Sequence, residues 1–256
     1  MSAFSLVRTI SRAARSAGLS FSEHDQCLAL SSVFLGKLCE QLVANLPGRR
    51  VAAGQSIYVI GDRGQSIYFL RSGLVKTGIV SEDGREFILQ VCKPGEIFGE
   101  FCFCEVGRLD QAVAIEPSEI VEIQFDDLVS HLRQHRQAML DFLKVNGVRL
   151  AEAYEQLRIL SVDRRMQRLV RTLLKLADQL GTPTPKGIQI AHHFKQEEVG
   201  EMIGTRREVV SGLLNQLRKM GLISYSRKHS ITINKKRLDD YLRTLSSEPH
   251  SKRINK

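Results

Sequence analysis

The sequence has 256 residues, of which 43% are hydrophobic and 25% charged, with 37 Lys and Arg against 28 Asp and Glu. This composition predicts a globular chain of one or two domains and excludes a wholly disordered one. The sequence contains no long uncharged apolar run, which excludes a membrane-spanning helix. Five cysteines, at positions 27, 39, 92, 102 and 104, do not make a disulfide framework, and we expect a cytoplasmic protein.

The positive charge is confined to the last third of the chain. Residues 1–161 carry a net charge of −2, whereas residues 162–256 carry +11. A basic segment of this size is expected of a domain that neutralises phosphates. The alternative is a solvated basic surface without a nucleic-acid partner.

Residues 1–30 are predicted to form an N-terminal arm. Arg8, Arg12 and Arg15 share one helical face, and no acidic residue lies nearby. Such a segment is either an organellar transit peptide or a loosely docked arm, and we interpret it as an arm. Residues 246–256 are predicted to form a basic tail.

Residues 31–130 are predicted to form an antiparallel β domain. A helix over Ser31–Ala44 precedes short strands that are separated by glycine-containing turns such as Asp83-Gly84. This regular spacing is typical of a small barrel or sandwich. The predicted strands are Ser56–Ile60, Ser66–Arg71, Leu74–Val80, Glu86–Cys92, Ala112–Ile115 and Ile120–Phe125.

Residues 131–161 are predicted to form a dimerisation helix. Apolar side chains recur there with the 4-3 spacing of a heptad seam, in which one member, Asn146, is polar. This stripe packs either on a second copy of the chain or on the β domain of its own chain, and we favour the second copy. The seam consists of Met139, Leu143, Asn146, Leu150, Ala153, Leu157 and Leu160.

Residues 162–245 are predicted to form a winged helix-turn-helix. A helical pattern runs from Val162 to Leu180, a Pro-containing loop covers Thr182–Lys186, and a strand follows at Ile188–Ala191. Two helices are expected next, and two short strands around a basic turn at Leu222–Ile233 are typical of a wing. The two helices are Lys195–Ile203 and Arg206–Met220.

The turn between these two helices has its own pattern. Gly200 leaves room for the second helix to approach the first, and Gly204 supplies the positive φ of a tight turn. Thr205 and Glu208 have the spacing of a capping box at the start of the second helix.

The second helix has one apolar and one polar face, as expected of a helix that enters the major groove of DNA. We expect Arg207, Glu208 and Ser211 to contact base edges. The alternative makes Glu208 a cap and Arg207 a solvated side chain. The residues expected to hold phosphates are Lys195, Gln196, Arg206, Arg227 and Lys228.

From about residue 30 to 245, the sequence resembles the cyclic-AMP-receptor/fumarate-nitrate-reductase (CRP/FNR) family of bacterial transcription factors. The segment Gly95-Glu96-Ile97-Phe98-Gly99-Glu100 is similar to the family's phosphate-binding cassette. The resemblance implies an α+β fold: an N-terminal antiparallel β jelly roll of the cyclic-nucleotide-binding type, a long dimerisation helix and a C-terminal winged helix-turn-helix. It also implies a homodimer that binds palindromic double-stranded DNA.

The cassette departs from the pattern of the family's cyclic-nucleotide binders. Gly99 and Glu100 are kept, but the Arg-Ser or Arg-Thr pair that holds the cyclic phosphate corresponds to Asp110-Gln111. A carboxylate repels a phosphate. The hydroxyl residues that meet the base correspond to Leu150 and Ala151. We therefore expect a degenerate effector pocket that does not use cyclic AMP, so the cofactor is unknown.

Other sensors of the family use an iron–sulfur cluster or haem, and neither is supported here. Cys102 and Cys104 are close in sequence, but Cys27 and Cys39 are distant, and a cluster needs four thiolates. We interpret these cysteines as buried and structural. The candidate haem ligands, His24, His131 and His135, are equally well explained as surface residues.

The sequence thus predicts a dimeric, sequence-specific DNA-binding regulator that responds to an unidentified signal in the β domain. RNA polymerase is an expected partner, and a membrane is not. Gly212 stands where the family often has an arginine, so its DNA specificity cannot be transferred. The alternative is a cyclic-nucleotide-responsive interaction module whose basic domain docks an acidic partner. No spacing typical of a catalytic site is present, so an enzyme is not expected.

Overall fold

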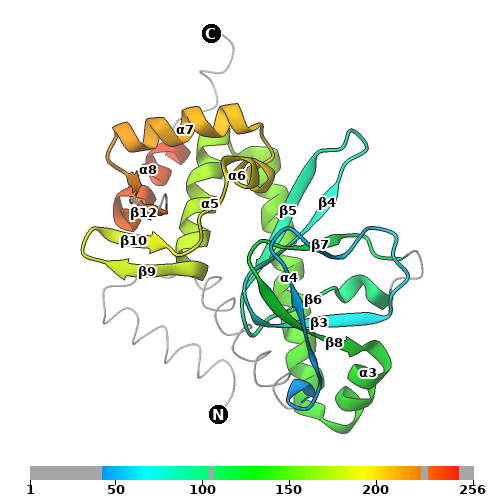
Figure 1. Ribbon diagram of the computed structural model, residues 1–256. Helices are drawn as coiled ribbons and strands as arrows, with labels where there is room; N and C mark the ends of the chain where they lie inside the picture. Colours follow the sequence, from blue (N-terminus) through cyan, green and yellow to red (C-terminus); the bar gives the residue numbers. More distant parts are fainter. Residues whose placement is uncertain (1–41, 104–106, 226–229, 248–256) are drawn as a thin grey trace. The chain divides into compact units, whose positions relative to one another are not determined.

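The computed structural model describes residues 42–103, 107–225 and 230–247 (Figure 1). The chain divides into two compact units, each taken here by itself. The first contains the residues up to Val80 together with Leu89–Tyr154, and the second contains Ser81–Ile88 and the chain from Glu155 onward. The predicted arm and most of the predicted helix Ser31–Ala44 lie outside the described residues.

The first unit is built on two antiparallel four-stranded sheets, which we call the β-roll. One sheet has the strand order β1 (Gly48–Val51), β8 (Ser118–Gln124), β3 (Ser66–Ser72) and β6 (Ile97–Phe98). The other has the order β2 (Ser56–Tyr58), β7 (Gln111–Ala114), β4 (Val75–Val80) and β5 (Glu86–Cys92). The α+β fold with an antiparallel N-terminal domain is thereby confirmed.

Two strands of the β-roll were not predicted. β6 has only two residues, and β1 is mostly exposed and contains two arginines, so neither shows an alternating pattern. β1 lies at a sheet edge, where it pairs with β8 from Gly48–Val121 to Val51–Ser118. Its position explains why polar residues are tolerated there.

Two helices follow the β-roll: α3 (Phe125–Gln134) and α4 (Arg136–Val162). His135 between them has extended backbone, so the long helix begins five residues later than predicted. Ala138 and Val145 of α4 are buried in the core with Ile123 and Leu128. One face of α4, which does not contain the predicted heptad stripe, therefore packs on the β-roll of its own chain.

The other face of α4 is exposed in the single chain. Met139, Leu143, Leu150 and Leu157 are 40%, 59%, 54% and 60% exposed. Tyr154, which the heptad pattern did not include, is 63% exposed on the same helix. An exposed apolar stripe of this length indicates a surface that is covered in an assembly.

The second unit contains α5 (Arg165–Leu180), β9 (Gly181–Thr184), β10 (Gly187–Ile190), α6 (Gln196–Ile203), α7 (Arg207–Lys219), β11 (Ile223–Tyr225), β12 (Ile231–Ile233) and α8 (Lys235–Ser247). Its sheet has the order β11-β12-β10-β9, and α5, α6 and α7 pack on one another. β9 was predicted as a loop because it contains Pro183. The strand forms at the sheet edge, where a missing N–H is tolerated. Of the helices within the described ranges, none is both long and apolar enough to cross a membrane.

Candidate nucleic-acid interface and the interior of the β-roll

The turn between α6 and α7 has the predicted geometry. Gly204 is left-handed with φ 64°, and its N–H donates to the carbonyl of Gly200. A Cβ on Gly200 would lie 2.7 Å from the carbonyl oxygen of Thr205, which leaves no room for a side chain. Both predicted roles of glycine in the turn are confirmed.

The predicted capping box at Thr205 and Glu208 is wrong. The N-cap of α7 is Arg206, and among the described residues no side chain caps this end. The Thr205 N–H instead donates to the carbonyl of Gly200, which tightens the turn. The interpretation of Glu208 as a cap is also wrong, and its exposed carboxylate is available to a partner.

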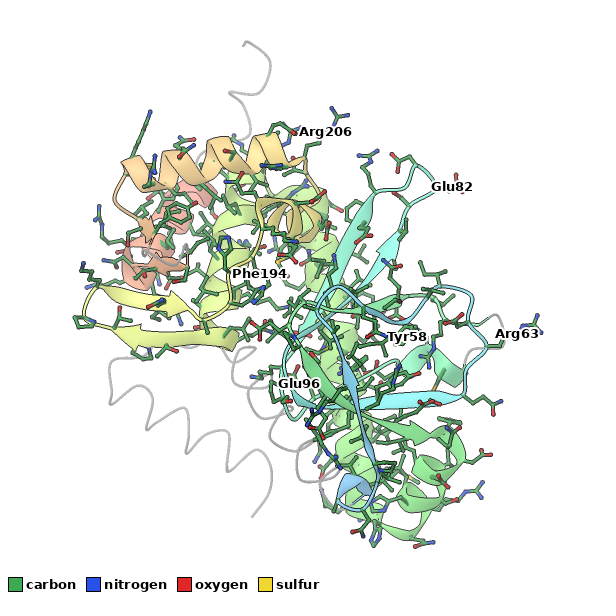
Figure 2. The ribbon with its side chains drawn as sticks, in the orientation of Figure 1. Tyr58, Arg63, Glu82, Glu96, Phe194 and Arg206 are labelled. Atoms are coloured by element: carbon green, nitrogen blue, oxygen red, sulfur yellow. The ribbon has the colours of Figure 1, made fainter. Side chains whose placement is uncertain are left out.

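The two faces of α7 differ as predicted. Val210, Leu214 and Leu217 are buried, whereas Arg207 and Glu208 are exposed at the start of the helix. Ser211, one turn further on, is half-buried, and Met220, predicted to be in the core, is 40% exposed. Figure 2 shows Arg206 at the beginning of this helix. The start of α7 therefore presents three consecutive exposed ionic residues, Arg206, Arg207 and Glu208.

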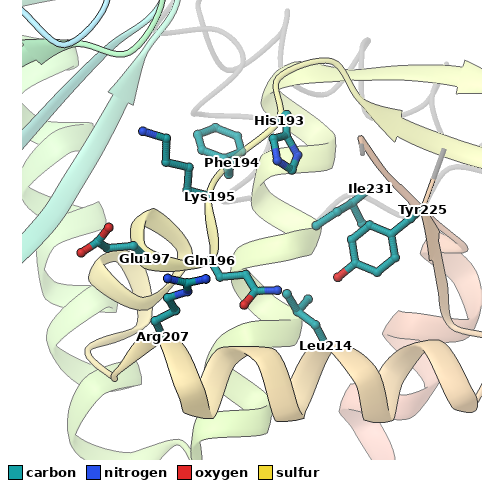
Figure 3. Close-up of a pocket in the computed structure, with 9 residues that line it drawn as sticks. All are labelled: His193, Phe194, Lys195, Gln196, Glu197, Arg207, Leu214, Tyr225 and Ile231. Atoms are coloured by element: carbon teal, nitrogen blue, oxygen red, sulfur yellow. The ribbon is translucent and has the colours of Figure 1, made fainter. Parts of the chain in front are cut away.

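A hollow of about 430 Å³ brings together residues that were predicted from separate motifs (Figure 3). Lys195 and Gln196 come from the start of α6, and Arg207 comes from the start of α7. The apolar lining comprises Phe194, Leu214 and Ile231, and Glu197 is also part of the lining. The hollow thus combines two basic side chains, Lys195 and Arg207, with polar and apolar neighbours, and basic side chains are the ones that contact the phosphates of a nucleic acid.

Sequence reasoning did not name the other six lining residues as site residues, among them His193 and Tyr225. The signal for Tyr225 is an aromatic residue in a short wing strand beside the basic turn. Burial raises the pKa of Tyr225, so its hydroxyl stays protonated and can donate. Arg227 and Lys228, the predicted wing contacts, lie outside the described residues.

The interior of the β-roll contains a buried arginine that the sequence did not reveal. Arg108 is 2% exposed, and its guanidinium lies 4.0 Å from the ring centroid of Tyr58. Its Nη1 donates to the carbonyl of Gly99 over 3.1 Å, and its Nη2 donates to the carbonyl of Ser66 over 2.5 Å. Arg108 thus contacts the predicted cassette from two residues before Asp110.

Asp110 lies in the same buried cluster. Its Oδ2 accepts a hydrogen bond of 3.1 Å from the hydroxyl of Tyr58, which is labelled in Figure 2. Burial raises the pKa of Asp110 to about 6, against the opposing effects of Tyr58 and Arg108. Within the described residues, Oδ1 of Asp110 and Nε of Arg108 are buried without a hydrogen-bond partner. Gln111 follows half-buried in β7.

Glu100, the retained acidic residue of the cassette, forms an ion pair with Arg149 of α4. Arg149 also donates to the carbonyl of Ile97, so one side chain joins α4 to the cassette. Sequence reasoning missed Arg149, although Leu150 and Ala151 beside it were candidates. Leu150 is more than half exposed and belongs to the stripe of α4, and Ala151 is half-buried.

In the described ranges, the cysteines and histidines considered as cofactor ligands show buried thiols and one close pair of histidine rings. Cys92 and Cys102 are buried, and neither forms a disulfide in the described part of the chain. Burial raises the pKa of the Cys92 thiol, which keeps it protonated. The rings of His131 and His135 lie 4.6 Å apart, and burial followed by the neighbouring His135 lowers the pKa of His131. No group of three or more His, Cys, Asp or Glu residues suited to a metal was found in the described ranges. His24, Cys27, Cys39 and Cys104 lie outside them.

Comparison with known proteins gives two matching family models. Residues 48–135 match the cyclic nucleotide-binding domain, and residues 167–241 match the Crp-like helix-turn-helix domain. The chain is 33% identical to the cyclic AMP receptor protein of Thermus thermophilus over 66% of this chain and 76% of the relative. It is 30% identical to the global nitrogen regulator of Synechocystis over 70% of this chain and 81% of the relative.

Among solved structures, FixK2 of Bradyrhizobium japonicum matches with a TM-score of 0.69 at 21% identity. The match covers 76% of this chain and 96% of that one, and it supports the fold. A β-roll followed by a helix-turn-helix with an exposed ionic face defines a DNA-binding transcription regulator. The chain belongs to the CRP/FNR family, whose members bind DNA, typically dimerise and are not enzymes. The alternative function as an interaction module is thereby replaced by transcription regulation.

Proposed function

We propose that the protein binds, as a homodimer, a roughly two-fold symmetric DNA site with half-sites about one helical turn apart. The observation that carries this proposal is the exposed ionic start of α7 beside the basic hollow. Arg207 donates to guanine, Glu208 accepts from cytosine, and Ser211 serves either sense. Phosphates are held by Lys195, Gln196, Arg206, Arg227 and Lys228.

The dimer forms along the exposed stripe of α4. One face of this helix is occupied by the β-roll core, so the face that remains open packs on the same helix of a second copy. Asn146 donates to the carbonyl of Phe142 one turn earlier, which satisfies the amide and reduces the cost of placing it in the seam. The seam consists of Met139, Leu143, Asn146, Leu150, Ala153, Leu157 and Leu160.

The signal that the β-roll senses is not cyclic AMP. Asp110 and Gln111 replace the phosphate-binding pair, and the Arg108 guanidinium already donates to two backbone carbonyls and stacks on Tyr58. A phosphate entering this space would meet the Asp110 carboxylate and would have to displace those bonds. The relatives are named for different signals, cyclic AMP and nitrogen, so membership of the family does not select one.

Two further points rest on the family and on DNA binding. RNA polymerase is the expected protein partner of a transcription regulator, and the cytoplasm is the compartment in which the protein would meet chromosomal DNA. Both belong to the proposal and are tested by transcription in a purified system with the operator in front of a promoter.

The test of the proposal is selection of bound duplexes from a randomised pool, followed by titration of the selected and scrambled duplexes at one salt concentration. We expect a selected consensus with two inverted half-sites and a specific affinity at least about a thousandfold above the non-specific one. Selection of a single unrepeated motif would contradict the dimeric mode. Equal affinity for selected and scrambled duplexes would contradict base reading.

A further inference from the structure

Within the second unit, the guanidinium of Arg168 on α5 contacts the last turn of α4 and the end of α6. Its Nη2 donates over 2.6 Å to the carbonyl of Leu160 in the last turn of α4. Its Nε donates over 3.0 Å to the carbonyl of Asp163, in the link between α4 and α5. Its Nη1 donates over 3.3 Å to the carbonyl of Ile203, the last residue of α6.

Two of these carbonyls are ones that a helix end leaves without an intrahelical partner. The N–H of Arg164, which would bond the carbonyl of Leu160 in a continued helix, donates instead to Oε1 of Gln167 over 2.7 Å. α6 likewise stops at Ile203, because Gly204 turns left-handed. A cation at two helix C-termini is also favoured by their dipoles. Arg168 therefore satisfies a terminal carbonyl of α4 and a terminal carbonyl of α6 with one side chain.

Neighbouring contacts hold the same junction. Gln156 of α4 donates over 3.2 Å to the carbonyl of Met202, so the two final carbonyls of α6 are both tied to side chains from preceding helices. Asp163, which is 7% exposed, pairs through its carboxylate with Nε of Arg171 over 2.6 Å. The link between α4 and α5 is thus fixed from its backbone and from its side chain.

We propose that Arg168 is a positioning residue for DNA binding, which fixes the α6–α7 pair against the last turn of α4. The inference rests on the proposed function. If α4 forms the dimer, the orientation of α7 relative to the last turn of α4 sets the spacing between the two copies of α7 that contact DNA. Arg168 donates to a backbone carbonyl of each helix, α4 and α6, and Gln156 adds a second link between them, so we assign to Arg168 the main part in setting that orientation.

This role has a signature that a purely structural role lacks. Binding of one half-site needs a folded α6–α7 pair but no fixed spacing. Simultaneous binding of two half-sites needs both, because the second contact is intramolecular and its strength depends on geometry. Loss of Arg168 should therefore weaken the two-half-site complex selectively.

The experiment compares full-length wild type, Arg168→Ala and Arg168→Lys on two duplexes: the selected operator and the same duplex with one half-site scrambled. For Arg168→Ala we expect an affinity loss of about tenfold to a hundredfold on the operator and less than about twofold on the single half-site. A spacer series lengthened or shortened by one base pair should show a weaker preference for the original spacing. Arg168→Lys should fall between, because an ammonium cannot reach the three carbonyls in the fixed fork of a guanidinium.

The matched control is Arg165→Ala, an exposed arginine on the first turn of the same helix, which should change neither affinity. Equal losses on both duplexes, or an unchanged spacer preference, would overturn the positioning role. If Arg168→Ala does not fold, by its circular dichroism, Arg168→Lys and Gln156→Ala carry the same comparison. Failure of the wild type to prefer the operator over scrambled DNA would instead overturn the proposed function.

Discussion

The two units of this protein use ionic side chains in opposite ways. At the start of α7, Arg207 and Glu208 are exposed beside the hollow that contains Lys195. Inside the β-roll, Arg108 and Asp110 are buried and contact Tyr58 and backbone carbonyls of their own chain. One set is available to a partner, and the other is largely satisfied internally.

The difference shows that the two domains of one family member can keep the family's functional features to different degrees. The helix-turn-helix keeps open the surface with which the family acts, because DNA binding needs exposed charge. The β-roll keeps the fold of a ligand-binding domain while its own side chains occupy the polar interior. Buried charge is costly unless an opposite charge or hydrogen bonds compensate it, and inside the β-roll burial raises the pKa of Asp110 while the Arg108 guanidinium lowers it.

The largest effect is expected for substitutions in α4, the helix that belongs partly to each unit. Replacing Leu150 and Leu157 with Lys places two charges in the seam, so the dimer should dissociate and operator affinity should fall at least about a hundredfold. Sedimentation and duplex titration measure the two effects. Lys144→Ala, on α4 but outside the stripe, should leave the dimer intact. A double variant that remains dimeric would place the interface elsewhere.

The next largest effect is expected when the interior of the β-roll is changed toward the pattern of the family's cyclic-nucleotide binders. The variant Arg108→Gln/Asp110→Arg/Gln111→Ser removes the internal guanidinium and restores the phosphate-binding pair. Wild type should bind cyclic AMP no better than in the millimolar range, and the variant should gain at least about a hundredfold, because two charge effects of about 1.5–3 kcal/mol each are reversed. Calorimetry decides it.

Gln111→Ser alone is the control for that variant and should gain little. Micromolar binding of cyclic AMP by wild type, accompanied by higher affinity for DNA, would show that the pocket works as an ordinary cyclic-nucleotide switch. In that case the contrast between the two units would be lost.

A pH titration sharpens the comparison between the two units, because burial inside the β-roll raises the pKa of a carboxylate. The pKa of Asp110 is raised to about 6, so the folded state binds this proton more tightly than the unfolded state does. Stability from this group is gained as pH falls through 6 and is absent above it. Relative to Asp110→Asn, wild type should gain on the order of 2–3 kcal/mol between pH 7.5 and pH 4.

Urea unfolding of both proteins at several pH values measures this difference. A constant difference in the free energy of unfolding across the range would mean that Asp110 titrates normally and is not confined with Arg108 and Tyr58.

The smallest effects belong to single exposed residues of the DNA-binding surface. Arg207→Ala should cost about 1–3 kcal/mol on the selected operator and relax discrimination at one base pair. Lys195→Ala should weaken selected and scrambled duplexes alike and reduce the salt slope by about one. An equal loss on both duplexes for Arg207→Ala would remove its base-reading role.

Sequence patterns predicted what depends on local periodicity. The glycine-punctuated strands, the stripe of α4 and the helix-turn-helix around Gly200 and Gly204 all follow from spacing along the chain. The missed helix α8 shows the limit of this approach. Its sequence is dominated by charged and polar residues, and Leu238 is its buried residue, so the helix depends on packing against α5.

The side chains that organise both units could not be predicted, because their roles depend on burial. Arg108 follows a turn glycine, where an arginine is ordinarily solvated, and only the folded β-roll places it under Tyr58. Arg149 and Arg168 look like the polar members of amphipathic helices. Arg149 pairs with Glu100, 49 residues away, and Arg168 has one of its three carbonyl partners, Ile203, 35 residues away, which are separations that no local pattern records.

The double use of α4 links folding to protein concentration. Ala138 and Val145 are part of the β-roll core, and in the proposed dimer the exposed stripe of the same helix packs on a second chain. Assembly that binds the folded helix and not the unfolded one stabilises the folded state by mass action. The melting temperature should therefore rise with the amount of protein, and a cell that makes few copies of this regulator would hold a less stable molecule than one that makes many.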